Sequence, residues 1–182
     1  CTIVGNLCNA GPAADSVPAM VAAGAKAVIQ GVKGKRTVPV EQIPVGPGKN
    51  SLKKGELVEA IVLPARKPRS GDAYLRFIPR TEMDIAVVSA AVNLTLDSKG
   101  VVTDARVSLG AVAPTVLLVA AAAKAIIGTK LDDAALEKLG EAASAACRPI
   151  DDKRGTIEFR TKVAAVLAKR AAKIAYGRAG GK

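Results

Sequence analysis

A short stretch near the N-terminus has the residue types of a ligand-binding loop. Residues 2–16, TIVGNLCNAGPAADS, combine small side chains with the Thr2 hydroxyl, two asparagine amides and the Asp15 carboxylate. Gly5 and Gly11 lack a Cβ atom, so the backbone beside them can approach a ligand closely and offer N–H groups to phosphate or sugar oxygens. On composition alone, however, an ordinary irregular loop before a helix is the better interpretation.

The absence of histidine from all 182 residues excludes several chemistries. Ser-His-Asp and Cys-His catalysis, the H-E-x-x-H zinc site and His-ligated haem cannot be formed by this chain. A reaction here must depend on a bound cofactor or on Asp, Glu, Lys, Arg, Ser and Thr.

The three cysteines, Cys1, Cys8 and Cys147, show no metal-binding spacing, and their odd number argues against a disulfide framework. We expect free thiols in a reducing compartment.

A second glycine-rich stretch, GPGKNS at residues 46–51, has some features of a phosphate-binding loop. A P-loop needs glycine where Ile43 stands, and Ser or Thr where Asn50 stands. The stretch therefore predicts a solvent-exposed turn.

The chain is basic, with 27 Lys and Arg against 16 Asp and Glu and a formal net charge of +11. Such an excess favours an acidic partner: nucleic acid, a phosphorylated cofactor or an anionic protein face. The basic residues are scattered, and four aromatic side chains are too few for a stacking platform that binds single strands. These four are Tyr74, Phe77, Phe159 and Tyr176. We therefore expect no nucleic-acid partner.

No segment of the sequence is predicted to span a membrane. The longest uncharged apolar stretch, residues 107–123, is shorter than the roughly 20 residues that a spanning helix needs, and Gly110 and Pro114 interrupt it. The N-terminus lacks the basic and apolar regions of a signal peptide. We expect a cytoplasmic protein and interpret Cys1 as the start of a truncated or processed chain.

The elements that would position the N-terminal stretch are short. Residues 13–23 predict a helix that starts near Asp15 or Ser16 and stops at Gly24. Strands are predicted at residues 26–30, 36–40 and 56–63. The basic, breaker-rich segment ARKPRSG at residues 65–71 is the best boundary, and we expect domains at residues 1–66 and 72–178.

The second domain starts with alternating apolar residues. Residues 86–96 and 101–109 predict an antiparallel hairpin with one covered face, joined by a turn that ends at Gly100. On the return strand the covered face is expected to hold Val101, Thr103, Ala105, Val107 and Leu109. Helices are predicted at residues 114–128, 131–147 and 156–176, and the last has an apolar stripe of Phe159, Val163, Val166, Leu167 and Ile174. A sheet followed by helices predicts the α+β class.

Three motifs give a resemblance to a known family. The stretch TIVGNLCNAGPAADSVP closely resembles the second flavin-binding loop of the FAD subunit in molybdenum hydroxylases, the family of xanthine dehydrogenase and aerobic carbon monoxide dehydrogenase. FIPRTEMDIA at residues 77–86 resembles the R-x-x-M-D-I-A segment of that family, and RGTIEFR at residues 154–160 resembles its R-G-x-x-E-Y/F-R segment. The similarity extends from Thr2 to about Tyr176.

This resemblance implies a fold. The chain corresponds to the second α/β half of a two-part FAD-binding domain, followed by an antiparallel sheet with three covering helices. The glycine-rich diphosphate loop of the family's N-terminal half is not found in the sequence. We expect that this portion was lost or lies on another chain.

The resemblance also implies site residues in the first loop. By position, the Thr2 hydroxyl is expected to hydrogen-bond FAD, and Gly5 and Asn6 to bring backbone and amide groups to its phosphate and ribityl region. Asp15 is expected to accept a hydrogen bond from a cofactor hydroxyl or amide. Val4 replaces the usual first glycine of the motif, and its β-branched side chain restricts the backbone there.

Further residues are implied beyond that loop. Val58 corresponds to the apolar residue that lies against the isoalloxazine ring. Arg76 takes the place of a lysine near the flavin, although on the residues alone it is equally well explained as a solvated charge on a strand. Arg80 and Asp84 belong to the loop that borders the ring and rank below the others.

The implied function is electron transfer. Substrate reacts at a molybdopterin cofactor in a large subunit, and electrons pass through 2Fe-2S clusters in a small subunit to FAD and then to NAD, a quinone or another acceptor. The resemblance implies that this chain is an oxidoreductase subunit that does not hydroxylate substrate itself. The alternative is a structural or assembly module that docks on the same partners without binding flavin.

Overall fold

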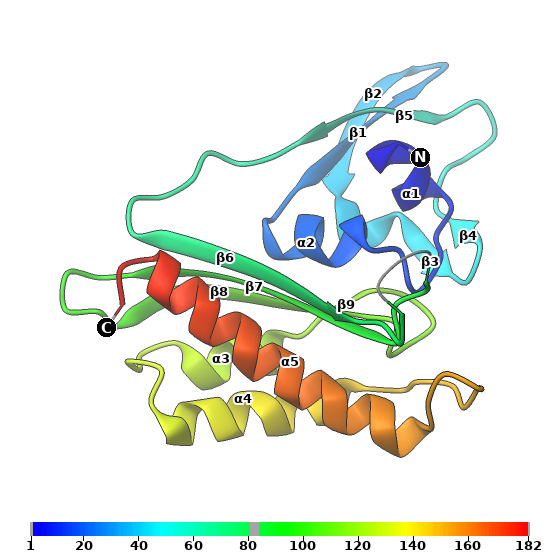
Figure 1. Cartoon of the computed structure of the whole chain (residues 1–182). Coiled ribbons are helices and arrows are strands. Elements are labelled where there is room, and N and C mark those ends of the chain that lie inside the picture. The colour runs from blue at the N-terminus through cyan, green and yellow to red at the C-terminus, as the bar shows by residue number, and fades with distance from the viewer. Residues whose placement is uncertain (1, 81–83, 182) are drawn as a thin grey trace.

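The computed structural model describes residues 2–80 and 84–181 and arranges them around two hydrophobic cores (Figure 1). The N-terminal part contains helices α1 (Ile3–Cys8) and α2 (Ser16–Ala22), a 3-10 turn (Val40–Gln42) and strands β1 (Lys26–Gly31), β2 (Gly34–Pro39), β3 (Pro44–Gly46), β4 (Lys49–Asn50) and β5 (Leu57–Val62). Strands β2, β1 and β5 form one antiparallel sheet in that order, and β3 pairs with β4.

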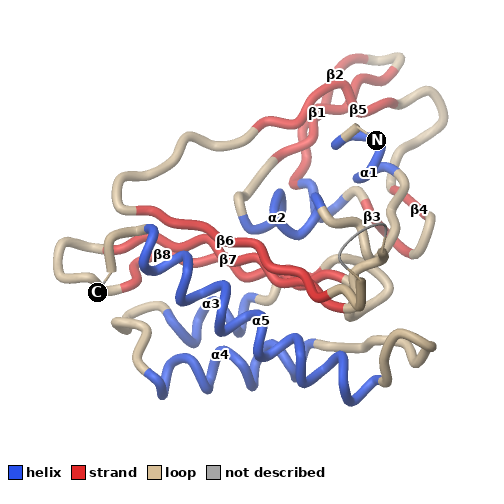
Figure 2. Tube along the Cα trace, viewed as in Figure 1, coloured by secondary structure: helices blue, strands red, loops and turns tan. Residues whose placement is uncertain are grey.

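The C-terminal part is a four-stranded antiparallel sheet with helices on one face. Its strands lie in the order β6 (Ser70–Phe77), β7 (Val88–Leu96), β8 (Val102–Gly110) and β9 (Leu117–Leu118). Helices α3 (Ala120–Ile126), α4 (Asp133–Ala146) and α5 (Ile157–Arg178) cover one face, and the N-terminal part lies on the other side (Figures 1 and 2). The predicted α+β class, with three helices over an antiparallel sheet, is confirmed.

The N-terminal core is small and draws on both parts of the chain. Leu7, Val21, Ile29 and Ile43 are completely buried in it. Val116, from the C-terminal part, packs into the same core. The two parts are therefore joined by apolar contact as well as by the connector.

The hairpin of β7 and β8 forms as predicted, with Gly100 at φ 80° in its turn. Its register shifts beside the turn: Thr95 pairs with Asp104, whereas the next residue, Leu96, pairs with Val102. Thr103 is the extra residue of this bulge, so Val102 is buried and Thr103 exposed. The prediction that Val101 and Thr103 continue the covered face was wrong for this reason.

The prediction of a single covered sheet face was also wrong. Ser89 and Ala91, on the face opposite the C-terminal helices, are only 2% and 1% exposed. Helix α2 packs on this face, and a Cβ atom added to Gly110 would lie 2.7 Å from Pro18. Helix α2, from the N-terminal part, therefore buries the second face of the sheet. The alternation of residues within the hairpin could not predict this contact.

The helix predicted from residue 114 begins only at Ala120. Leu117 and Leu118 instead pair with β8 and extend the sheet as β9. The chain between them and Gly110 forms bends. Because edge pairing with β8 satisfies the backbone of this apolar stretch, the helix starts after the strand.

The apolar stripe predicted for α5 was wrong in most of its members. Phe159, Val166 and Ile174 are each about 40% exposed, and the buried face consists mainly of alanines. These are Ala164, Ala168, Ala171, Ala172 and Ala175. Small side chains let α5 approach β6 closely, since a Cβ atom on Gly71 would stand 2.0 Å from the Ala175 carbonyl oxygen. The face of α5 that packs on the sheet is therefore the one with small side chains, which allow close approach, and not the one with the largest apolar side chains.

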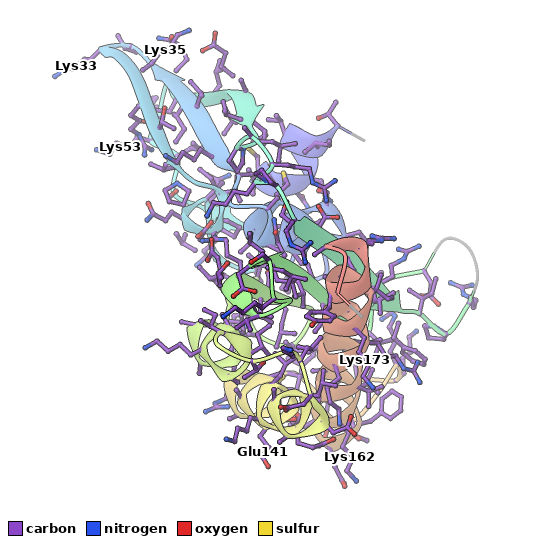
Figure 3. All side chains as sticks on the ribbon, turned by 90° about the vertical axis from the view of Figure 1, so that its left-hand side faces the viewer. Lys33, Lys35, Lys53, Glu141, Lys162 and Lys173 are labelled. Carbon is purple, nitrogen blue, oxygen red and sulfur yellow. The ribbon has the colours of Figure 1, made fainter. Side chains whose placement is uncertain are left out.

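The lysines labelled in Figure 3 lie on separate surfaces. Lys33, Lys35 and Lys53 stand at the far end of the N-terminal sheet, whereas Lys162 and Lys173 lie on α5 at the opposite end (Figure 3). Within the described residues, no helix has the length and apolar character needed to cross a membrane.

Candidate functional site

The N-terminal stretch predicted as a loop begins with a short helix, α1. Thr2 caps it: its Oγ1 accepts a hydrogen bond of 2.9 Å from the Gly5 N–H. A Cβ atom at residue 5 would stand 2.9 Å from that same oxygen, so glycine suits the cap. The N–H groups of Ile3 and Val4, in the first turn, have no partner within the helix because of its geometry. Val4 packs against the N-terminal core, which directs its side chain inward.

Asn6 joins α1 to the start of α2. Its Oδ1 accepts a hydrogen bond of 2.6 Å from the Ser16 hydroxyl and another of 3.3 Å from the Ser16 N–H. Its amide nitrogen makes no hydrogen bond within the described residues. Asn6 therefore fixes the shape of the stretch and retains a donor.

Asp15 lies directly before α2 and contacts the C-terminal sheet. The Tyr74 hydroxyl donates a 3.1 Å hydrogen bond to Asp15 Oδ1, and the Arg76 guanidinium pairs with Oδ2. Residues two apart on a strand share a face, so β6 presents Tyr74 and Arg76 together. We call Asp15, Tyr74 and Arg76 the interdomain cluster. It brings together two site residues expected from the resemblance.

The interdomain cluster is partly exposed. The Asp15 side chain is 44% exposed and that of Arg76 34%, so both groups remain accessible to a ligand. Tyr74 is more buried. Burial raises the pKa of its hydroxyl, a hydrogen bond with Ser89 lowers it, and the Asp15 charge raises it again; the net shift is upward. The hydroxyl therefore stays protonated and acts as a donor.

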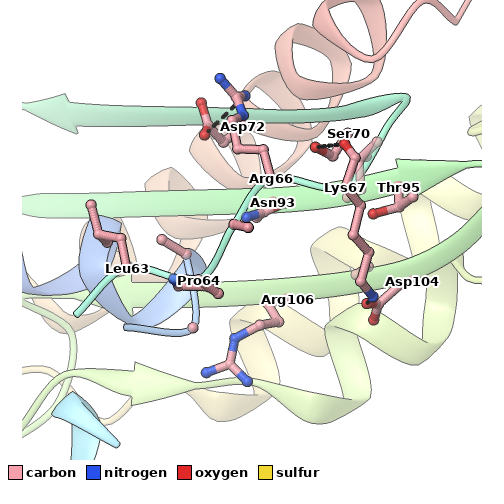
Figure 4. Close-up of a pocket in the computed structure, with 15 residues that line it drawn as sticks. Leu63, Pro64, Arg66, Lys67, Ser70, Asp72, Asn93, Thr95, Asp104 and Arg106 are labelled. Atoms are coloured by element: carbon pink, nitrogen blue, oxygen red, sulfur yellow. Dashed lines mark hydrogen bonds and ion pairs between the residues drawn. The ribbon is translucent and has the colours of Figure 1, made fainter. Parts of the chain in front are cut away.

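Two clefts lie on the same sheet face, and Tyr74 of the cluster lines the first of them. The first, of about 360 Å³, separates α2 from β6 and β7, and its walls include Ile3, Ser16, Met20, Leu63 and Tyr74. The second, of about 330 Å³, lies between the connector and the sheet (Figure 4). The Lys67–Asp104 pair, at 2.8 Å, borders it, and Arg106 donates to Val21 O and Glu41 Oε1 at its floor.

Val58 lies apart from this cluster. It is 8% exposed on β5 and belongs to the N-terminal core with Leu7 and Ile29. The neighbouring Leu57 points to the other side of the strand and is 57% exposed. The structure thus places Val58 inward, whereas Leu57 and, at the other end of β5, Val62 are exposed to solvent.

The second and third sequence motifs meet each other in the C-terminal part. Asp84 accepts from Arg80 at 3.2 Å and lies 3.7 Å from Arg154, and Asp152 pairs with Arg160 at 2.7 Å. We call these five residues the arginine clasp. Phe77 and Phe159 add an edge-to-face ring contact between the same motifs. Residues 81–83 of the second motif lie outside the described residues.

Burial acts on both acids of the clasp, but their partners outweigh it. For Asp84, burial raises the pKa, whereas the Ile85 N–H, Arg80 and Arg154 lower it below the usual value. For Asp152, the Arg154 N–H and then Arg160 lower the pKa. Both carboxylates are held in the charged form.

Sequence reasoning missed Tyr74 as a site residue. The signal was present in its spacing from Arg76, because two residues apart on a strand place both side chains on one face. The residues that cover that face could not be predicted from the sequence of the strand.

No group of three or more Cys, Asp or Glu side chains in the described part of the chain is placed to hold a metal ion.

Models of two protein families match the chain. Residues 73–175 match the CO dehydrogenase flavoprotein C-terminal domain, and residues 1–66 match the FAD binding domain in molybdopterin dehydrogenase. Similar proteins include the carbon monoxide dehydrogenase medium chain of Afipia carboxidovorans, which is 37% identical over 98% of this chain. A putative xanthine dehydrogenase FAD-binding subunit from Escherichia coli is 31% identical over 100% of it.

Solved structures agree with these matches. A crystal structure of Cu,Mo-CO dehydrogenase in its cyanide-inactivated form contains a chain with a TM-score of 0.92 and 36% identity, covering 97% of this chain and 61% of that one. A carbon monoxide dehydrogenase from Hydrogenophaga pseudoflava gives a TM-score of 0.93 at 32% identity, covering 98% and 61%. The chain spans 61% and 62% of the lengths of the two curated relatives named above.

Proposed function

This chain belongs to the family of FAD-binding subunits of molybdenum hydroxylases, and on that premise we propose that it binds FAD and transfers electrons within a multi-subunit oxidoreductase. The interdomain cluster is the observation that carries the proposal. It places Asp15, from the flavin-loop motif, against Arg76, the position where the family has a lysine near the flavin.

The residues present fit the cofactor. The first-turn N–H groups of α1 and the amide nitrogen of Asn6 are donors suited to phosphate and ribityl oxygens. The Asp15 carboxylate has lone pairs beyond those taken by Tyr74 and Arg76, so it can also accept from a hydroxyl or an amide. Bound FAD would supply two-electron and one-electron redox chemistry. The Arg76 cation would favour negative charge on the reduced ring and so raise its potential.

The other redox groups are assigned to partners. We propose a molybdopterin-binding large subunit and a small subunit with 2Fe-2S clusters, with NAD, a quinone or another acceptor receiving the electrons. Cys8 and Cys147 are free thiols, and burial raises the pKa of both, that of Cys147 to about 11. Protonated thiols are poor metal ligands. Free thiols are also typical of a reducing compartment such as the cytoplasm.

In this proposal, residues 1–66 form the second half of an FAD-binding domain and residues 72–178 a C-terminal domain. The separate cores support that division. The basic excess serves the cofactor's phosphates and acidic faces of the partner subunits.

Titration of the purified chain with FAD tests the proposal, with fluorescence quenching and the visible flavin absorbance after dialysis as readouts. We expect saturable binding, and we expect Asp15→Asn to weaken it about tenfold, because it removes a charged acceptor from the site. Glu137→Gln is the matched control: it removes one negative charge from α4, where Glu137 pairs with Lys169. A chain that neither retains nor binds FAD would contradict the proposal and support the flavin-free assembly module.

A further inference from the structure

Tyr74 is the residue of the interdomain cluster to which neither the motifs nor the comparisons assign a role. It stands on β6 and donates to an acceptor 59 positions earlier in the chain. Arg76 takes the other oxygen of the same carboxylate. One oxygen is thus held by a neutral donor and the other by a cation, and both donors come from a single strand.

The surroundings of Tyr74 hold its ring in place. On β7 its cross-strand partner is Ala91, which is fully buried and too small to displace the ring. Arg76 pairs in the same way with Ser89, which is 2% exposed. The ring forms part of the wall of the cleft between α2 and the sheet. A rigid sheet position therefore sets where the hydroxyl lies.

A carboxylate held by a single flexible cation can rotate and move with it. A second donor on the other oxygen removes that freedom and keeps the remaining lone pairs in fixed directions. Lower conformational freedom before binding reduces the entropy that binding must overcome. Arg76 alone, at 34% exposure, does not supply this constraint.

We propose that Tyr74 is a positioning residue for FAD binding, which acts by orienting the Asp15 carboxylate. The inference rests on the proposed function, since it assigns Tyr74 a role in the same site. Tyr74 acts through Asp15 and requires no contact of its own with the cofactor.

Tyr74→Phe removes the hydroxyl and leaves the ring. We expect FAD to bind about tenfold more weakly, as for the loss of a hydrogen bond to a charged group. The chain offers a matched control in Tyr176, the other of its two tyrosines. The Tyr176 hydroxyl donates a 2.7 Å hydrogen bond to the Gly100 carbonyl oxygen at the hairpin turn, and Tyr176→Phe should leave FAD affinity unchanged.

A double-mutant cycle separates positioning from a general loss of structure. In the Asp15→Ala background, Tyr74→Phe should weaken FAD binding no further, because the acceptor of its hydrogen bond is gone. The midpoint potential of the bound flavin is the second readout. We expect Tyr74→Phe to shift it relative to wild type, whereas Tyr176→Phe should not.

The outcomes are distinguishable. A wild-type chain that binds no FAD overturns the proposed function itself. A wild-type chain that binds FAD, with wild-type affinity in Tyr74→Phe or equal weakening in both tyrosine variants, overturns the role of Tyr74 alone. Additive effects of Tyr74→Phe and Asp15→Ala would also overturn it.

Discussion

The arginine clasp and the interdomain cluster are both built from arginine and aspartate, yet their environments differ. In the clasp, Arg160 is 4% exposed and donates to Asp152, to the Val87 carbonyl at 2.6 Å and to the Gly155 carbonyl at 3.3 Å. In the interdomain cluster, Asp15 and Arg76 are each at least a third exposed. The first lies within one part of the chain, and the second joins two parts.

This difference in exposure indicates which of the two clusters stabilises the fold and which can bind a ligand. Each nitrogen of the buried Arg160 guanidinium already donates a hydrogen bond to a protein acceptor, so it offers little to a ligand, and its removal deprives buried acceptors of a donor. A half-exposed carboxylate contributes little to stability but retains acceptor capacity. We therefore assign the Arg160–Asp152 pair of the clasp to folding of the C-terminal part and the interdomain cluster to binding.

The largest effect on stability is expected for Arg160→Met, which keeps the aliphatic volume and removes the charge. Val87 O loses the hydrogen bond from the Arg160 side chain, and Asp152 loses its 2.7 Å ion pair and keeps only its contacts with Arg154. We expect a loss of about 3 kcal/mol in the free energy of unfolding. Urea denaturation measures this loss, and hydrogen exchange of the β7 amides locates it. Arg170→Met, on the exposed side of the same helix, should change stability by less than about 0.5 kcal/mol. Equal effects of the two variants would remove the distinction between the clusters.

Acid should weaken the clasp next. The pKa of Asp152 in the folded chain is below its usual value of 3.8, so the charged form stabilises the fold above that value. This stabilisation is lost as the pH falls below about 3.8 toward the folded-state pKa. The free energy of unfolding, measured with urea at a series of pH values, should therefore decrease more steeply with falling pH in this range for wild type than for Asp152→Asn. If the free energy of unfolding depended on pH in the same way in both proteins, the charged form of Asp152 would not stabilise the fold.

The smallest effect is expected for Asp15→Asn. Its half-exposed ion pair and hydrogen bond predict a loss of no more than about 1 kcal/mol in the free energy of unfolding, measured by the same urea denaturation. The variant should thus lose FAD affinity while it keeps its fold. A loss as large as that of Arg160→Met would make Asp15 a structural residue and weaken the proposed function.

Local patterns predicted the elements that depend on neighbours in the chain. Gly100 and the alternation around it predicted the hairpin, and the acids at the start of α4 predicted its N-terminus, where Asp132 Oδ1 accepts from the Ala135 N–H at 2.8 Å. The candidate site between Thr2 and Asp15 was indicated by the resemblance of this motif to a flavin-binding loop, since its composition alone favoured an ordinary loop. Each of these signals acts within a few residues.

The predictions that failed depend on distant contacts. The apolar stripe of α5 was placed on its largest side chains, whereas the close approach of β6 at Gly71 selects the alanine face. The helix predicted from residue 114 gave way to pairing with β8. Ser89 and Ala91 are buried by a helix from the other part of the chain.

The sequence by itself determined which chemistries are possible: without histidine, this chain can offer hydroxyls, amides, carboxylates and cations to a cofactor but no imidazole. It also determined, through local alternation and caps, most of the elements. Only the tertiary structure decided that Asp15 is held by Tyr74 and Arg76. That contact requires α2 to pack on the face of β6 that presents both side chains, and such packing depends on sheet register and shape complementarity over about sixty residues of separation.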